Sequence, residues 1–155
     1  MKTIIIIALL GLSIVQVNAQ KMKESDIPSV VKAAFKKAFP SAKEVKWSKE
    51  EEEAGLYEVE FKNSKTEMSV LMDEAGTVKE VETEIKKSEL PTAVQESIKK
   101  DYAGYKIEEA AKIVSNGITT YEAEVEKGEK SFDLIFDVNG KLLKKIEKKE
   151  KDEKD

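Results

Sequence analysis

Two stretches of the chain decide its fold: "EMSVLMDEAG", Glu67–Gly76, and "SFDLIFDVNG", Ser131–Gly140. Each alternates apolar and polar residues and then ends on Asp-x-x-Gly. Alternation with a period of two predicts a β-strand that buries one side. Asp at the first position and Gly at the fourth fit a type I hairpin turn in which the glycine is left-handed. Each stretch therefore predicts a strand that turns back into a neighbouring antiparallel strand.

The similarity extends outward from these stretches in both directions. Ile27-Pro28 aligns with Leu90-Pro91, and each pair opens a segment with an apolar residue every fourth position. That spacing predicts an amphipathic helix at 27–39 and another at 90–102. The prolines suit the first helical turn, and Pro40 and Ala103-Gly104 suit the helix ends. The chain is therefore an internal repeat.

Each predicted helix is followed by alternating segments typical of strands: 44–48, 56–61, 67–72 and 77–85 in the first repeat, and 107–114, 121–126, 131–136 and 141–148 in the second. The predicted fold class is α+β, with two tandem repeats. Each repeat is a helix followed by about four antiparallel strands, and the helices lie on one face of the sheet. One such repeat is marginal alone, so we expect the two to share a sheet or to pack together.

The chain also divides by composition. Residues 1–19 have a lysine, an apolar run and the small-residue sequence Val17-Asn18-Ala19, which is typical of a cleaved signal peptide. A membrane anchor is the alternative, which the shortness of the apolar run disfavours. The predicted divisions are a signal peptide at 1–19, a linker at 20–26, the repeats at 27–86 and 87–148, and a charged disordered tail at 149–155. We expect a periplasmic or secreted protein with no membrane span after cleavage.

The absence of three residue types limits the catalytic and metal-binding sites that the chain can form. The chain has no cysteine and no histidine, and all of its 27 basic residues are lysine. This excludes Ser-His and Cys-His nucleophiles and the usual ligands of zinc, copper and iron. The net charge of −4 disfavours nucleic acid as a partner. We expect no cofactor.

The order of the motifs resembles a known family. Two copies of "[IL]P-x-x-V" and "D-x-x-G", with "K-x-V-K-W" and "Y-E-V-E-F" between them, resemble the PepSY-like, beta-lactamase-inhibitor-like periplasmic proteins of Bacteroidetes. The resemblance covers most of Ile27–Glu147. It implies tandem α+β units and a periplasmic or secreted location, and it does not imply an enzyme.

Strand alternation predicts which side chains face away from the helices. This face holds Glu58, Glu60 and Leu71 in the first repeat and Glu122, Glu124 and Ile135 in the second. If the two sheets join, the acids form a stripe that attracts cationic partners. Paired carboxylates can also perform acid–base chemistry when burial separates their pKa values. We expect these acids to face water, which disfavours catalysis.

Two single features have competing interpretations. Trp47, the only tryptophan, can anchor a partner or fill the space between helix and sheet, and its parity with Val45 favours the core. "DVNG", Asp137–Gly140, is a fragment of a calcium-loop pattern, but the same turn in "DEAG" explains both copies as hairpins.

Two functional hypotheses follow. The first is an exported, non-catalytic module that binds a protein or peptide partner, and its narrower version is an inhibitor of a peptidase or another envelope protein. The second is a protein that binds a small ligand or a cation, such as calcium or a polyamine, on its acidic sheet face.

Overall fold

The computed structural model describes residues 21–49 and 55–148. It contains two α-helices, two short 3-10 helices and nine strands. The first half comprises β1 Lys21–Met22, η1 Glu24–Asp26, α1 Ser29–Ala38, β2 Ala42–Lys49, β3 Leu56–Asn63, β4 Thr66–Asp73 and β5 Val78–Glu84. The second comprises η2 Lys87–Glu89, α2 Thr92–Asp101, β6 Lys106–Ser115, β7 Ile118–Lys127, β8 Lys130–Asp137 and β9 Leu142–Lys148.

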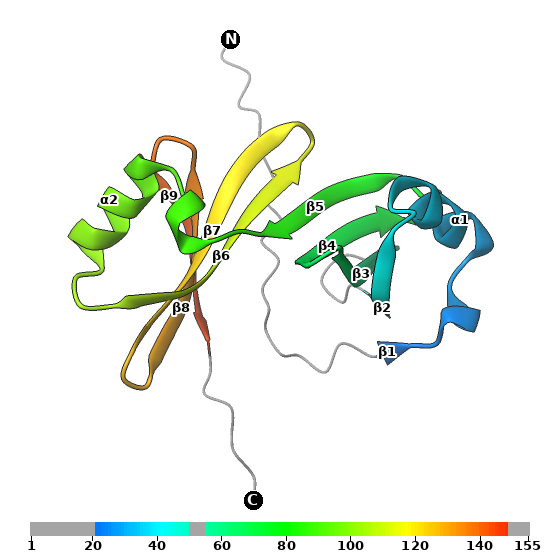
Figure 1. Cartoon of the computed structure of the whole chain (residues 1–155), viewed down its shortest axis with the longest axis horizontal. Helices are drawn as coiled ribbons and strands as arrows, with labels where there is room; N and C mark the ends of the chain where they lie inside the picture. Colours follow the sequence, from blue (N-terminus) through cyan, green and yellow to red (C-terminus); the bar gives the residue numbers. More distant parts are fainter. Residues whose placement is uncertain (1–20, 50–54, 149–155) are drawn as a thin grey trace, which may run out of the picture.

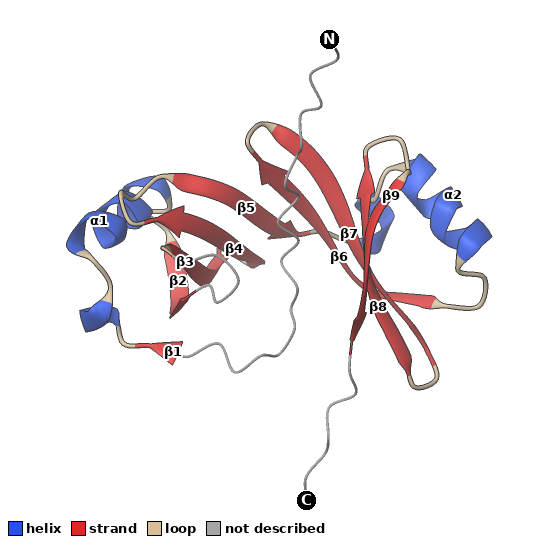
Figure 2. Ribbon diagram, turned by 180° about the vertical axis from the view of Figure 1, so that it is seen from behind, coloured by secondary structure: helices blue, strands red, loops and turns tan. Residues whose placement is uncertain are grey.

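All nine strands form one antiparallel sheet in chain order, β1 to β9. The halves join where β5 pairs with β6, with Glu82 opposite Ile113 and Glu84 opposite Ala111. The expectation of a shared sheet is therefore confirmed, as is the α+β class. Figure 1 shows α1 and α2 at opposite ends of this sheet, and Figure 2 shows the same arrangement from behind.

Each helix covers its own half of the sheet. Ile27, Val31 and Phe35 pack with apolar residues of β2, β3 and β4, and Leu90, Val94 and Ile98 pack with those of β6, β7 and β8. The strand register puts both sets of strand residues on the same side of the sheet. These two apolar clusters are the core, and the other side of the sheet has no helix among the described residues.

The two Asp-x-x-Gly turns have the same geometry. In each, the glycine N–H donates to the aspartate carbonyl oxygen, at 2.9 Å in the first turn and 3.0 Å in the second. The aspartate Oδ1 also accepts backbone N–H groups of the turn, from Ala75 and Thr77 in the first and from Asn139 and Lys141 in the second. Both glycines have φ +80°, and the strand that follows each turn carries a bulge. The hairpin prediction is correct in both copies.

Gly140 and Gly76 also lie against the helices. A Cβ on Gly140 would collide with the Ala93 carbonyl oxygen, and a Cβ on Gly76 would lie 2.8 Å from the Ala34 Cβ. The Ser97 hydroxyl donates to the Gly140 carbonyl oxygen at 2.7 Å. The repeated turn therefore positions the helix over the sheet as well as reversing the chain.

Some boundaries differ from the sequence-based expectation. Residues 21–26, expected to be a linker, contain β1, which pairs with β2, and η1. Pro28 and Pro91 occupy the N-cap positions, one residue before the predicted first turn. The expected signal peptide at 1–19 and the tail at 149–155 lie outside the described residues.

Candidate functional site

The side of the sheet opposite the helices is acidic across both halves. Strand register aligns Glu60, Ser69 and Glu82 in one row, on β3, β4 and β5. The next row contains Glu84 on β5 and Glu122 on β7, on either side of Ala111 on β6. The acids therefore form a continuous stripe because β5 and β6 join the two halves.

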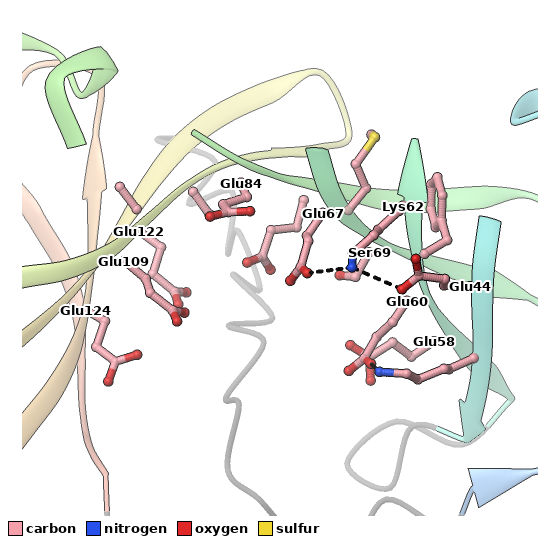
Figure 3. A pocket seen from close by; sticks show the side chains of 16 residues that line it. Glu44, Glu58, Glu60, Lys62, Glu67, Ser69, Glu84, Glu109, Glu122 and Glu124 are labelled. Atoms are coloured by element: carbon pink, nitrogen blue, oxygen red, sulfur yellow. Dashed lines mark ion pairs between the residues drawn. The ribbon is translucent and has the colours of Figure 1, made fainter. Parts of the chain in front are cut away.

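The stripe borders a hollow of about 300 Å³. We call it the acidic hollow, and its charged lining consists of Glu44, Glu58, Glu60, Glu67, Glu82, Glu84, Glu109, Glu122 and Glu124 with Lys46 and Lys62. Figure 3 shows Glu109, Glu122 and Glu124 on one side of it, and Glu58, Glu60 and Lys62 on the other. Nine carboxyl groups against two ammonium groups give the hollow a strongly negative potential.

Both lysines of the lining form ion pairs on the first-half side of the hollow. Lys62 Nζ lies 3.0 Å from a Glu44 carboxylate oxygen and 3.6 Å from one of Glu67, and Lys46 Nζ lies 3.6 Å from one of Glu60. All these side chains are well exposed, so each pair contributes little to stability. The acids of the lining on β5, β6 and β7 take no part in these pairs.

Glu122 lies at the centre of this charge and is only 6% exposed. Burial, followed by the neighbouring Glu82 and Asp133 carboxyl groups, raises its pKa to about 9. Burial and the nearby Glu80 and Glu58 raise the pKa of Glu82 to about 7. Glu122 therefore holds a proton at neutral pH, and Glu82 is close to half-protonated.

A second polar group lies beside Glu122. Lys148 Nζ pairs with a Glu124 carboxylate oxygen at 2.5 Å and with Asp133 Oδ1 at 3.5 Å, and the Ser131 hydroxyl donates to Glu124 at 3.1 Å. Burial raises the pKa of Asp133, which is 1% exposed, although Lys148 opposes the rise. Burial alone would lower the pKa of Lys148, but its bonds to Glu124 and Asp133 raise it overall. Lys148 thus stays charged between Glu124 and Asp133.

The predicted contact residues separate into two groups. Glu58, Glu60, Glu122 and Glu124 all line the acidic hollow, as the predicted stripe requires. The two apolar residues of the predicted contact face are buried, since Leu71 is 3% and Ile135 is 1% exposed. Leu71 packs against Leu56 on this side of the sheet.

The expectation that Glu122 faces water is wrong. Alternation along a strand predicts which face of the sheet a side chain takes, but not whether that face is exposed to solvent. Glu122 lies on β7, an interior strand of the nine, and it is buried although it is on the side away from the helices.

Five acids of the lining were not predicted: Glu44, Glu67, Glu82, Glu84 and Glu109. Glu82 and Glu84 alternate along β5, so their shared face was visible in the sequence. Their place at the centre depends on the pairing of β5 with β6, which no local pattern specifies.

Trp47 belongs to the core. It is 7% exposed, and its ring lies 5.3 Å from that of Phe35 in an edge-on arrangement. The core interpretation is therefore confirmed. Val45 is exposed, because a register shift between Lys43 and Lys46 changes the parity of β2.

The Asp-x-x-Gly turns use their aspartate Oδ1 atoms to bind backbone N–H groups, as described above. In residues 21–49 and 55–148, no group of three or more acidic residues is close enough to hold one metal ion. Within the same residues, no helix is long and apolar enough to cross a membrane.

Known structures share this fold. A BLIP-like protein from Bacteroides fragilis is 25% identical, with a TM-score of 0.63 over 83% of this chain and 92% of its own. A DUF2874 family protein from Bacteroides uniformis is 22% identical, with a TM-score of 0.69 over 77% and 88%. A protein from Bacteroides eggerthii described among "putative periplasmic proteins" is 18% identical, with a TM-score of 0.70 over 77% and 88%.

Comparison with the curated proteins gives no match. One family model matches the chain twice, at residues 14–80 and 57–144, and these matches together span most of its length. The model is described as "Putative beta-lactamase-inhibitor-like, PepSY-like". The chain therefore belongs to the PepSY-like family, and its two similar halves are PepSY-like repeats.

Proposed function

We propose that the protein is an exported, non-catalytic binding module that holds a protein partner against the helix-free side of its sheet. The observation that carries the proposal is the acidic hollow, which gathers side chains from both repeats. Joining the repeats edge to edge gives one wide surface, and a wide surface suits a macromolecular partner better than a small molecule.

The chemistry of the hollow supports binding rather than catalysis. A pair of catalytic carboxyl groups needs one ionised and one protonated member at the working pH. The neighbours that shift Glu82 are all acids, and those of Glu122 are acids except for Lys148. The two raised pKa values differ, about 7 for Glu82 and about 9 for Glu122, so the pair does reach the protonation that acid–base chemistry requires. The sequence, however, has no histidine or cysteine to supply a further base or a nucleophile, and on that ground we favour binding.

An envelope location fits the family and the neighbours. The Bacteroides eggerthii structure is described among periplasmic proteins, and the predicted signal peptide at 1–19 would deliver the chain to that compartment. The narrower proposal is inhibition of a peptidase or a β-lactamase, which the "BLIP-like" description of the Bacteroides fragilis neighbour supports.

Affinity capture from a periplasmic extract tests the binding proposal. The baits are the wild-type chain, Glu84→Lys with Glu109→Lys, and Glu74→Lys with Glu96→Lys. The first pair changes exposed acids of the hollow, and the second makes the same charge change at exposed positions away from the hollow. We expect a protein that the wild type and the second variant retain and the first loses.

Reconstitution with the purified partner then gives its affinity for each variant. The inhibitory version predicts a dose-dependent loss of peptidase or β-lactamase activity when the pure proteins are mixed. A partner retained equally by all three baits would place binding elsewhere on the molecule, and no reproducible partner would count against the proposal as a whole.

A further inference from the structure

The negative charge of the acidic hollow is not balanced by the described lysines. Lys46 and Lys62 pair with exposed glutamates of the first half, and Lys148 pairs with Glu124 and Asp133. Among the residues that the structure describes, no ion pair involves Glu82, Glu84, Glu109 or Glu122. The region around β5, β6 and β7 therefore attracts cations.

Glu122 supplies an independent sign of a ligand. Its side chain lines the hollow and is more than nine-tenths buried, yet within the described part of the chain its Oε2 atom has no hydrogen-bond partner. Glu82 Oε2 is in the same condition. Buried polar atoms almost always have a partner, and leaving one without a partner is energetically unfavourable. A bound cation donating to both carboxyl groups would supply the missing interaction.

The spacing of the acids indicates what kind of cation fits. The acids of the lining come from strands β2 to β7, and adjacent strands are about 4.8 Å apart, so apart from the neighbouring Glu82 and Glu122 they are spread across the sheet and not gathered around one point. No three of the described acids are close enough to hold a metal ion. A flexible molecule with several separated ammonium groups matches this distribution. An extended peptide segment that contains several lysines is such a molecule.

We infer that the acidic hollow binds a lysine-bearing segment of the partner polypeptide, with an ammonium group received between Glu82 and Glu122. This inference rests on the proposed function and specifies the chemistry of the partner. It also explains why Glu82 and Glu122 each have a buried carboxyl oxygen without a hydrogen-bond partner, since the partner that they lack belongs to another molecule.

Binding of this kind must be linked to protons. Glu122 is faced by Glu82, Glu124, Asp133 and Lys148, and Glu82 is faced by Glu58, Glu80, Glu109 and Asp133. An incoming ammonium group favours the ionised carboxylates and lowers their pKa values. Glu82 and Glu122 therefore release protons when the segment binds, and the affinity rises as the pH increases from about 7 to about 9.

Isothermal titration calorimetry tests the inference with the full chain and a short synthetic peptide of alternating lysine and alanine. Titrations at pH 7.5 in two buffers of different ionisation enthalpy measure proton release. We expect the wild type to bind the peptide with proton release and to ignore a copy whose lysines are acetylated. Glu82→Gln with Glu122→Gln should bind about tenfold more weakly or worse and release no protons, a difference of about 1.4 kcal/mol or more.

Glu74→Gln with Glu96→Gln is the matched control, because it removes two exposed carboxylates away from the hollow. It should retain wild-type affinity and proton release. Equal binding by both double variants, or binding without proton release, would overturn the inference. Spermidine that binds as tightly as the peptide would overturn the assignment to a polypeptide.

The two proposals fail differently. If capture of a partner depends on Glu84 and Glu109 but the lysine peptide does not bind, the binding function stands and the lysine chemistry is wrong. If the peptide binds and no partner is ever captured, the proposed function is wrong, and the inference that rests on it falls with it.

Discussion

Glu122 shows how a single side chain acquires its properties from the elements around it. In water its carboxyl group would ionise near pH 4.5, but burial on an interior strand and the adjacent acids raise its pKa to about 9. The fold therefore holds a proton that the unfolded chain has released across that whole interval. By linkage, the free energy of unfolding falls as the pH rises from about 4.5 to about 9.

Glu122→Gln should remove this dependence, because glutamine resembles the protonated acid and does not titrate. We expect the variant to be more stable than the wild type at pH 8 by a few kcal/mol, because each pKa unit of linkage is worth about 1.4 kcal/mol, and nearly equal to it at pH 4. Denaturant unfolding at several pH values measures both. Glu126→Gln, at an exposed position of the same strand, is the control and should leave the pH profile unchanged. An unaltered slope in Glu122→Gln would contradict the raised pKa.

Leu71 gives a second test at this scale, because alternation predicts the face of the sheet that it takes but not that it is buried there. An exposed leucine could be shortened with a change within about 0.5 kcal/mol, whereas a buried one costs about 2–5 kcal/mol when cut to alanine. Leu71 is buried against Leu56, so we expect Leu71→Ala to fall in the higher range. Val138→Ala, at an exposed position of the second turn, is the comparison. Chemical denaturation of both variants decides between the two interpretations.

At the scale of elements, the Asp-x-x-Gly turn has two roles, and its sequence signature predicts only the first: it reverses the chain, and it contacts the helix. Aspartate and glycine were sufficient to predict the hairpin, since both act through local backbone geometry. The contact of Gly140 with Ala93 on α2 is not visible in the sequence, because it joins residues far apart in the chain. For the same reason the sequence predicts a linker where β1 lies, because a two-residue strand is defined by its pairing with β2 and not by a pattern of its own.

Gly140→Ala separates the two roles of this glycine. Gly117 has nearly the same φ, +78° against +80°, but a Cβ there would have no neighbour within 4 Å. Gly117→Ala should therefore lose about 1–2 kcal/mol from the left-handed backbone alone. Gly140→Ala should lose a further 1–3 kcal/mol, roughly the cost of overpacking, since the new methyl group meets the Ala93 carbonyl oxygen. Equal losses in denaturant unfolding would mean that the turn does not position α2.

At the scale of the whole molecule, the pairing of β5 with β6 creates the site. The internal repeat, the two helices and the four strands after each of them follow from periodicity and turn chemistry. The pairing of one repeat's edge strand with that of the other cannot be predicted in this way, because it depends on backbone hydrogen bonds that leave no local sequence pattern. Glu82, Glu84 and Glu109 were consequently missed, although Glu58 on β3 and Glu124 on β7 were found.

Because β5 pairs with β6, acids of both repeats repel one another across the hollow. The dependence of stability on salt concentration should reveal this repulsion. About 1 M sodium chloride shortens the screening length to roughly 3 Å, so it weakens repulsion across the hollow. At pH 8, where Glu82 is mostly ionised, we expect salt to raise the free energy of unfolding. At pH 5, where Glu82 and Glu122 are mostly protonated, it should raise it less. Glu84→Gln with Glu109→Gln should reduce the response at pH 8, while Glu74→Gln with Glu96→Gln should preserve it. The same response in both variants would show that the repulsion is spread over the whole surface and is not centred where the repeats meet.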